Sequence, residues 1–398
     1  MSVAIYTLTS PLHDEAAVAG VTREFLSTLN CTYDFCATDY AGFGSSHDLD
    51  LIYVRTGGTE GLFKELLPKL GNGPFYLLTS GKSNSLAASM EILSFLRQRG
   101  LKGEILHGDA GYVNGRIALL HEVEAARRKM RGTRLGIIGK PSDWLISSSF
   151  DPAAIRQKLG VELVEIPMEE VLEALEPSTL ADAAIACGTP VYESAQPVQN
   201  AFPGAWSLYK ALRRVVERHD LKGFTIRCFD LLTAVKNTGC IALAQLNADG
   251  YVAGCEGDVP AMLSMYIGRS LLGVSGFQAN PSRIDPQTGE ILFAHCTIPF
   301  NMVENWQFDT HFESGIGVGI HGVFPEGPVT VFKVSGDLKR HFVAEGELIG
   351  NQYEQNLCRT QVILQLKPED ARYFLTDPIG NHHIIVPGRC KELFEELL

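Results

Sequence analysis

Residues 51–60 read Leu51-Ile52-Tyr53-Val54-Arg55-Thr56-Gly57-Gly58-Thr59-Glu60, a short apolar run that passes directly into a small, polar loop. The apolar half is typical of a strand buried on both faces of a parallel sheet. Two further runs of this kind, Val3 to Tyr6 and Pro74 to Leu78, alternate with segments of helical period at Glu15 to Leu29 and Leu86 to Gln98. This alternation predicts an α/β domain with a parallel sheet.

A second α/β unit begins at the apolar run Leu135 to Gly139, after a charged segment that places a boundary near residue 132. We expect its other strands at Val161 to Ile166, Asp182 to Cys187, Phe224 to Cys228 and Tyr251 to Cys255. After about residue 272, valines, threonines and glycines alternate with few helical periods, which predicts a sandwich or barrel. The predicted fold is α/β, with two doubly wound parallel-sheet domains at 1–132 and 133–272 and a β-rich C-terminal domain at 273–398.

The composition restricts the partners of this chain. It has 398 residues, 45% of them hydrophobic, and 34 Lys and Arg against 46 Asp and Glu, a formal net charge of −12. This is the composition of a folded, soluble protein, and its acidic excess excludes nucleic acid and anionic membranes as general partners. The nine cysteines form no CxxC pair, and no stretch of about 18 apolar residues occurs, so we expect reduced thiols and a cytoplasmic location.

Small, polar loops follow one expected strand after another. Each loop alone is compatible with an ordinary turn and helix cap, but ligands of open parallel sheets bind beyond the carboxyl ends of the strands. Their accumulation at one edge therefore predicts a binding site. The loops are Arg55 to Glu60, Thr79 to Ser85, Lys140 to Trp144, Gly188 to Pro190, Asp230 and Glu256 to Asp258.

The segment Gly254-Cys255-Glu256-Gly257-Asp258-Val259-Pro260 is the most informative of these, since a strand ends in two carboxylates and a helix begins. Asp258 could simply be the N-cap before Pro260. That role leaves Glu256 unexplained, and also Asp230 at the end of the preceding strand-like segment. Three converging carboxylates would repel one another, and a divalent cation would remove the repulsion.

Six of the eleven histidines fall in the β-rich third, at positions 295, 311, 321, 341, 382 and 383. Their spacing matches no HExxH or paired-cysteine zinc pattern, so spacing alone defines no metal site. His321 and His341 fit ordinary structural roles, whereas His295 follows an expected strand and precedes Cys296 and Thr297.

Several motifs together resemble the L-fucose isomerase-like family, which is related in fold to L-arabinose isomerase. The resemblance covers most of the chain. The motifs lie at 55–60, 141–145, 239–251, 255–258, 294–296, 310–313 and 380–383.

The resemblance implies interconversion of an aldose and a ketose with a divalent metal such as Mn²⁺. The family holds its metal with a Glu, an Asp and a distant His, and Asp258 and His382 match the latter two. Asp230 matches the Glu only approximately, and Glu256 is the alternative for that place. We predict Asp230, Asp258 and His382 as metal ligands and Asp230, Asp258 and Glu256 as catalytic residues.

The same motifs predict substrate-binding residues, namely His295, His311, Gly58, Thr59, Glu60 and Trp144. The family also implies a homo-oligomer, a trimer or hexamer, in which the loop at 57–60 could serve a neighbour's site. The sugar itself is not identified, and an anionic one that uses Arg55, Lys82 or Arg283 is compatible with the sequence. Two alternatives remain open, a non-catalytic sugar-binding or regulatory protein of the same fold and a sugar epimerase.

Overall fold

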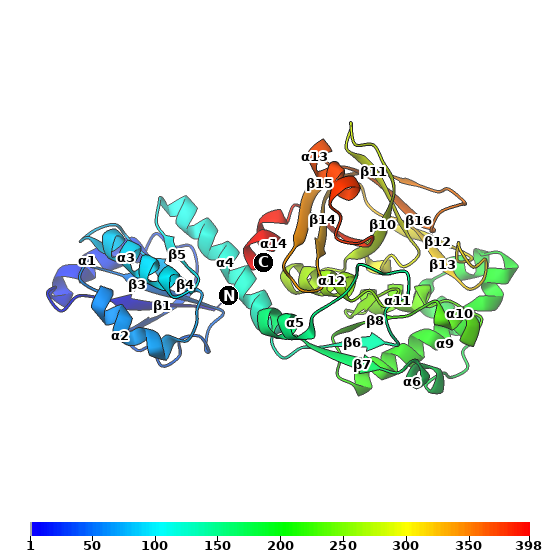
Figure 1. Ribbon diagram of the computed structural model, residues 1–398, viewed down its shortest axis with the longest axis horizontal. Coiled ribbons are helices and arrows are strands. Elements are labelled where there is room, and N and C mark those ends of the chain that lie inside the picture. The colour runs from blue at the N-terminus through cyan, green and yellow to red at the C-terminus, as the bar shows by residue number, and fades with distance from the viewer. Residues whose placement is uncertain (1) are drawn as a thin grey trace. The chain divides into compact units, whose positions relative to one another are not determined.

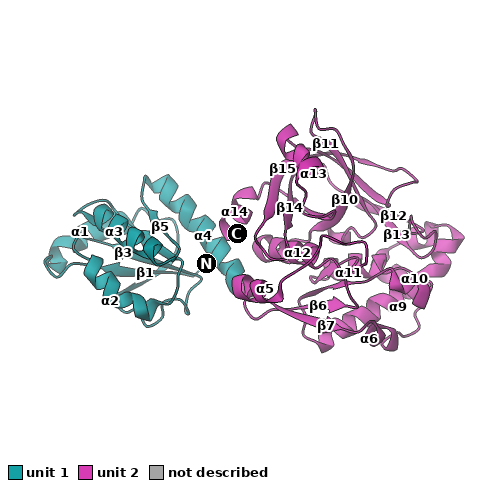
Figure 2. Ribbon diagram, in the orientation of Figure 1, with its two compact units in different colours: residues 1–128 teal, residues 129–398 magenta. Residues whose placement is uncertain are grey.

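The computed structural model describes residues 2–398 as a mixed α/β chain (Figure 1). It divides into two compact units, residues 1–128 and 129–398 (Figure 2). The second unit contains both a parallel sheet and a β-barrel, so the division into three separate domains stays a prediction.

The first unit is built on a five-stranded parallel sheet with the strand order β2-β1-β3-β4-β5. Apolar side chains fill both faces of this sheet, as the continuous apolar runs of β1, β3 and β4 predict. Its elements are β1 (Val3–Leu8), α1 (Glu15–Leu26), β2 (Tyr33–Ala37), β3 (Leu49–Val54), α2 (Glu60–Leu70), β4 (Phe75–Leu78), α3 (Ser85–Gln98), β5 (Gly103–Leu106) and α4 (Ala110–Met130), which runs across the boundary between the units.

The second unit begins with a four-stranded parallel sheet of order β7-β6-β8-β9. The strands are β6 (Arg134–Ile138), β7 (Glu162–Ile166), β8 (Gly223–Ile226) and β9 (Val252–Gly254). The helices are α5 (Pro152–Leu159), α6 (Met168–Glu173), α7 (Leu180–Cys187), α8 (Pro190–Glu193), α9 (Gln196–Arg218), α10 (Asp230–Ala234), α11 (Cys240–Ala248) and α12 (Val259–Leu272).

A closed barrel follows, with the strand order β10-β11-β16-β15-β14-β17. Its strands are β10 (Phe277–Ile284), β11 (Glu290–His295), β14 (Gly327–Val334), β15 (His341–Gln352), β16 (Thr360–Gln365) and β17 (His383–Pro387). The short helix η1 (Phe300–Met302), a two-stranded ribbon and two helices complete the unit. The ribbon pairs β12 (Asn305–Asp309) with β13 (Gly319–Val323), and the helices are α13 (Pro368–Thr376) and α14 (Lys391–Leu397). The prediction of a β-rich final third is confirmed, in the form of a barrel.

One hydrophobic core joins the sheet and the barrel of the second unit. It includes Ile138 and Phe224 from the parallel sheet together with Phe293 and Val331 from the barrel, all almost fully buried. The carboxyl edge of the sheet and the strand ends of the barrel are therefore fixed relative to each other, which is what a site made from both requires.

The prediction of a strand at Asp182 to Cys187 is wrong, because these residues belong to the helix α7. The side chain of Thr179 accepts a hydrogen bond from the backbone N–H of Asp182, while the Asp182 carboxylate accepts one from the backbone N–H of Thr179. This capping box, followed by an alanine-rich stretch, favours a helix over the apolar run that suggested a strand. The helix α13 within the β-rich third was also not expected.

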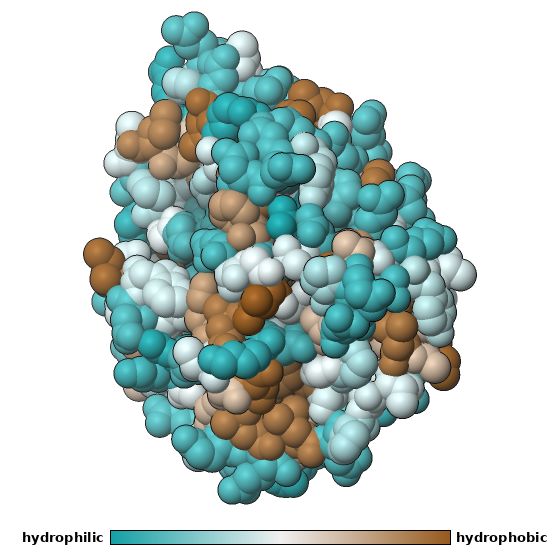
Figure 3. Space-filling view, turned by 90° about the vertical axis from the view of Figure 1, so that its right-hand side faces the viewer, coloured by the Kyte–Doolittle hydropathy of each residue, from teal (hydrophilic) through white to brown (hydrophobic). Residues whose placement is uncertain are grey.

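Within residues 2–398, no helix is long and apolar enough to cross a membrane. Figure 3 shows one face of the molecule, on which hydrophilic side chains predominate and hydrophobic ones gather in a patch below its centre.

Candidate metal and substrate site

A tight turn between β9 and α12 presents the first of the site residues, Glu256. Glu256 and Gly257 both adopt positive φ, 64° and 69°, and a Cβ at Gly257 would lie 2.6 Å from the backbone oxygen of Lys140. A left-handed conformation at a glutamate costs free energy, and such residues concentrate at functional sites. Backbone hydrogen bonds from Gly257 to Ile226 and from Ser142 to Glu256 hold the turn in place.

Two histidines come to the same place from the barrel. His295 is the last residue of β11, and His382 directly precedes β17. The strand β10 lies between these two strands, since Ala279 is opposite His383 and Asn280 is opposite Ala294. The two imidazole rings are 5.5 Å apart, so residues 87 positions apart (382 − 295) become neighbours.

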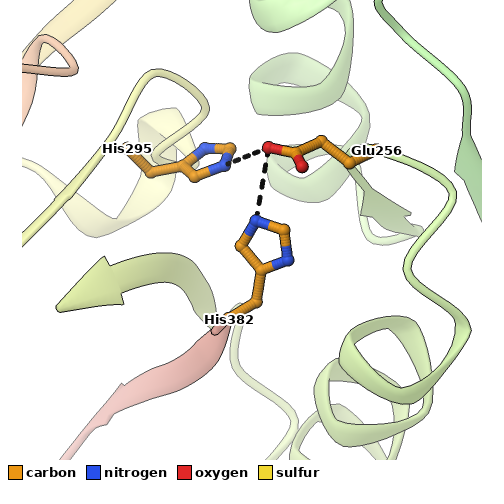
Figure 4. Close-up of side chains that lie close together, drawn as sticks. All are labelled: Glu256, His295 and His382. Atoms are coloured by element: carbon orange, nitrogen blue, oxygen red, sulfur yellow. Dashed lines mark ion pairs between the residues drawn. The ribbon is translucent and has the colours of Figure 1, made fainter. Parts of the chain in front are cut away.

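Glu256, His295 and His382 form a compact cluster (Figure 4). Oε1 of Glu256 lies 3.3 Å from Nε2 of His382 and 3.9 Å from Nε2 of His295. One ligand atom from each residue lies within 4.8 Å of the other two, and all three residues are buried. Ligands about 2.1 Å from a common ion lie roughly 3 to 4 Å apart, so the cluster is close to the size of a metal site.

The hydrogen bonds of the two rings leave their Nε2 atoms available as ligands. Nδ1 of His382 donates to Oδ2 of Asp258 at 2.8 Å, and Nδ1 of His295 is 2.8 Å from the hydroxyl of Thr297. Nε2 of His382 is buried and forms no hydrogen bond. Such a nitrogen lacks the partner that buried polar atoms normally have, and a metal ion would supply one.

The charges of Glu256, His295 and His382 shift one another's pKa values. Burial would raise the pKa of the Glu256 carboxyl, but the neighbouring His382 lowers it to about 2. Burial would lower the pKa of His382, but its hydrogen bond to Asp258 and the charge of Glu256 raise it to about 9. Burial, together with the nearby His382, lowers the pKa of His295 to about 3. At neutral pH the metal-free cluster therefore holds a proton on His382 that a metal ion would displace.

Two imidazoles and one carboxylate make a donor set that suits first-row divalent ions such as Mn²⁺, Fe²⁺, Co²⁺ or Zn²⁺ better than Mg²⁺ or Ca²⁺. Three protein ligands on one side of an ion leave other positions open for substrate oxygens. The residues present therefore fit a catalytic divalent metal, with two nitrogen donors where the predicted set of Asp230, Asp258 and His382 has one.

Asp258 lies behind His382 and is fully buried. Its Oδ1 accepts from the backbone N–H of Ala261 and caps α12, while its Oδ2 accepts from His382 and lies 3.5 Å from Nζ of Lys333. Burial would raise the pKa of Asp258, but Lys333 and His382 hold it well below its usual range. This geometry makes Asp258 the carboxylate that orients His382, and its predicted role as a metal ligand stays a prediction.

Asp230 is not part of the cluster of three. It is the first residue of α10, its side chain is 46% exposed, and its Oδ1 accepts from Nε of Arg227 at 3.0 Å. Arg227 also binds Asp143 through its guanidinium. The ligand and catalytic roles of Asp230 stay predictions.

A cavity adjoins the cluster and has His295, His311 and Glu256 in its lining. The space between its walls and its open mouth, solvent included, is about 480 Å³. Trp144 is half-exposed, and its Nε1 donates to Oε2 of Glu256 at 2.6 Å, while its ring packs edge-on against Phe229 in the cavity wall. Three of the predicted substrate-binding residues, His295, His311 and Trp144, thus gather around the cluster.

The other three, Gly58, Thr59 and Glu60, belong to the first unit. They follow β3, where Gly58 adopts a φ of 70° and Glu60 begins α2. Nearby, the buried Arg55 forms a bidentate pair with Glu15. Their role in a substrate site, including one in a neighbouring subunit, stays a prediction.

Several residues of the cavity were missed by the sequence reasoning. Glu313 lines the cavity, and partial burial together with the charge of Glu256 raises its carboxyl pKa. Asn280 also lines it, and its buried Oδ1 has no hydrogen-bond partner. Glu313 lay within a quoted motif, but no sequence signal marked Asn280, because its role depends on the pairing of β10 with β11.

Curated proteins resemble the chain over a large part of its length. It is 25% identical over 284 residues to the sulfoquinovose isomerase of Clostridium sp. (strain MSTE9), covering 64% of this chain and 61% of that protein. It is 22% identical over 294 residues to the sulfoquinovose isomerase of Priestia aryabhattai, covering 70% and 66% respectively. The matches thus span less than two thirds of these relatives' own length. No family model matches the chain.

The relatives are sugar isomerases by name, which is the broad class that the sequence motifs implied. At this level of identity, membership of the L-fucose isomerase-like family stays a prediction.

Proposed function

We propose that the chain is a metal-dependent aldose–ketose isomerase whose cluster of Glu256, His295 and His382 holds a divalent ion. The observation that carries the proposal is the convergence of a carboxylate oxygen and two imidazole nitrogens, all buried, at the wall of a cavity. The sulfoquinovose isomerases among the curated relatives support the same class of reaction.

Isomerisation of an open-chain aldose moves one proton from C2 to C1 and another from the C2 hydroxyl to the C1 oxygen. A divalent ion in the cluster would act as a Lewis acid that stabilises the negative charge developing on these two oxygens. The chain's own residues must then transfer the protons.

Glu313 is our candidate for the carbon-bound proton. It lies in the cavity lining and remains solvent-accessible, and its raised pKa brings it closer to neutral pH, where a carboxylate can both take and return a proton. His311 is our candidate for the hydroxyl proton. Burial lowers the pKa of His311, so its imidazole stays neutral, and its Nδ1 is fixed by the hydroxyl of Ser314 at 3.0 Å.

The names of the relatives point to a sulfonated aldose as the substrate to propose for this chain. None of the described residues that line the cavity is a lysine or arginine. The sulfonate would therefore extend beyond this lining, and Arg283 of the second unit remains a candidate for holding it. We keep Mn²⁺ as the proposed ion.

The test is an isomerase assay over a panel of aldoses, including sulfoquinovose, glucose, L-fucose and L-arabinose, after chelation and re-addition of Mn²⁺, Co²⁺ or Mg²⁺. We expect ketose to form only with metal, and the NMR spectrum of the product to distinguish isomerisation from epimerisation. Full activity after exhaustive chelation would contradict the proposal.

A matched pair of variants isolates the cluster. Glu256→Gln removes the carboxylate charge with little change of shape, whereas Glu290→Gln makes the same change at the exposed far end of β11. We expect Glu256→Gln to lose both Mn²⁺ binding and activity while Glu290→Gln retains both. Equal Mn²⁺ binding and equal activity of the two variants would show that the cluster takes no part in the reaction.

A further inference from the structure

Five of the nine cysteines line the cavity beside the candidate metal cluster. They come from separate parts of the second unit, and the proposed isomerisation uses none of them. Two sulfur atoms are in close contact, since Sγ of Cys228 lies 3.0 Å from Sγ of Cys255 in an S–H···S contact. The five are Cys228, Cys240, Cys255, Cys296 and Cys358.

The parallel sheet brings Cys228 and Cys255 together. Thr225 of β8 pairs with Gly254 of β9, so both chains leave the sheet at the same edge. The backbone N–H of Cys255 donates to Oε1 of Gln278 at 2.9 Å, and its carbonyl accepts from the hydroxyl of Thr225 at 3.3 Å. The thiols are therefore held close by a rigid framework, and a disulfide bond of about 2.05 Å would need a closure of about 1 Å.

We propose that Cys228 and Cys255 are an oxidation site, at which hydrogen peroxide produces a disulfide that disables the neighbouring metal cluster. The effect on activity rests on the proposed function, whereas the disulfide itself does not. Cys228 lines the cavity and is 9% exposed against 5% for Cys255, so it is the thiol of this pair that a small oxidant reaches more readily.

The chemistry balances in two steps. The sulfur of Cys228 attacks one oxygen of hydrogen peroxide, so that an S–O bond forms, the O–O bond breaks, and a sulfenic acid and one water result. The sulfur of Cys255 then attacks the sulfenic sulfur, and the S–O bond breaks with loss of a second water. Two thiols are oxidised by two electrons, and one peroxide is reduced to two waters.

Cys255 is bonded to Glu256 along the chain, and Cys228 is linked to it through the side chains of Phe229 and Trp144. Cys255 precedes Glu256 in the chain, and Glu256 has the left-handed conformation that tolerates little rearrangement. Cys228 precedes Phe229, whose ring lies 4.8 Å from that of Trp144, and Trp144 donates to the Glu256 carboxylate. Closing the sulfurs by about 1 Å therefore displaces Glu256, and a misplacement of this size costs up to about 100-fold in rate.

The experiment treats the Mn²⁺-loaded protein with hydrogen peroxide and measures three quantities. These are the disulfide map from mass spectrometry of unreduced peptides, the Mn²⁺ affinity, and the isomerase activity before and after dithiothreitol. We expect a linked peptide pair containing residues 228 and 255 that is two hydrogens lighter than the separate peptides. We also expect at least a tenfold loss of activity and of Mn²⁺ affinity, both restored by dithiothreitol.

Cys228→Ser, Cys228→Ala and Cys255→Ser are compared with Cys31→Ser, which removes a thiol of the first unit. Each is scored against its own untreated sample. The two Cys228 variants should resist peroxide, Cys255→Ser should stop at the sulfenic acid of Cys228 and form no disulfide, and Cys31→Ser should respond as the wild type does.

Absence of the 228–255 pair from oxidised protein, or equal peroxide sensitivity of Cys228→Ser and wild type, would overturn the proposal. If no aldose is isomerised, the proposed function fails, but the peptide map and the Mn²⁺ affinity still test the proposed oxidation site. The two failures are therefore distinguishable.

Discussion

Asp258→Asn tests whether the buried carboxylate behind His382 acts through that histidine. Asparagine caps helices about as well as aspartate, so the cap of α12 on Ala261 should survive. The change removes the negative charge that lies 2.8 Å from Nδ1 of His382 and 3.5 Å from Nζ of Lys333. Replacing the carboxylate partner of a metal-binding histidine typically weakens metal binding by about 10 to 100-fold, or roughly 1.4 to 2.8 kcal/mol.

The same substitution also leaves Lys333 without its counter-charge. Both side chains are almost completely buried, and breaking a buried pair by removing one partner costs about 3 to 5 kcal/mol of stability. A double variant, Asp258→Asn with Lys333→Met, removes both charges at similar volume. We expect it to recover most of the lost stability but not the lost Mn²⁺ affinity.

Isothermal titration with Mn²⁺ at constant pH, together with thermal unfolding, separates the two effects. Asp230→Asn is the matched control, since its half-exposed carboxylate pairs only with Arg227 outside the cluster and should change Mn²⁺ binding by less than about 1 kcal/mol. Wild-type Mn²⁺ affinity in the double variant would refute the reasoning. A larger loss in Asp230→Asn than in Asp258→Asn would instead favour Asp230 as the ligand.

Three further substitutions examine the cavity. Trp144→Phe removes the hydrogen bond to Oε2 of Glu256 and should lower kcat/KM by about tenfold with little change in Tm, because hydrogen bonds to charged groups contribute roughly 1.5 to 3 kcal/mol and this side chain is half-exposed. Asn280→Ala removes the unpaired Oδ1 and should raise KM more than it lowers kcat, which steady-state kinetics on the sugar measures; unchanged KM would exclude a substrate contact. Glu313→Gln removes the candidate proton carrier and should lower kcat by about 100-fold or more while Mn²⁺ affinity, followed by titration, stays near the wild-type value.

Where the local pattern was strong, the sequence predicted the structure well. The apolar runs at Val3 to Tyr6 and Leu51 to Val54 are strands, because a parallel strand covered on both faces needs a continuous apolar run. The segment Asp182 to Cys187 was mistaken for a strand because periodicity alone does not distinguish a short apolar run in a buried strand from one in a helix. The capping box at Thr179, three residues before the run of interest, was the signal that could have decided for a helix.

The sequence predicted only part of the site. Glu256 and Asp258 were recognisable because they stand together where a strand ends and a helix begins, and the Asn-His pair placed His382 by resemblance. The sequence carries no information on the spatial order β17-β10-β11, and this order is what puts His295 beside His382. Asp230 and Asp258 were grouped because neighbouring strands end side by side, but Asp230 is half-exposed and pairs with Arg227, whereas Asp258 is buried and pairs with His382 and Lys333.

The difference between Glu256 and Asp258 follows from backbone geometry rather than residue type. Asp258 has extended backbone angles and turns its carboxylate back onto the first turn of α12, where the free N–H groups and the buried Lys333 and His382 saturate it. Glu256, two residues earlier, is in the left-handed region, which turns its longer side chain away from the helix toward the barrel. There its Oε1 meets two imidazole nitrogens and its Oε2 meets Trp144. Of two carboxylates on one short turn, one therefore pairs with His382 and Lys333 and caps α12, and the other lies against the two imidazole nitrogens that we propose as metal ligands.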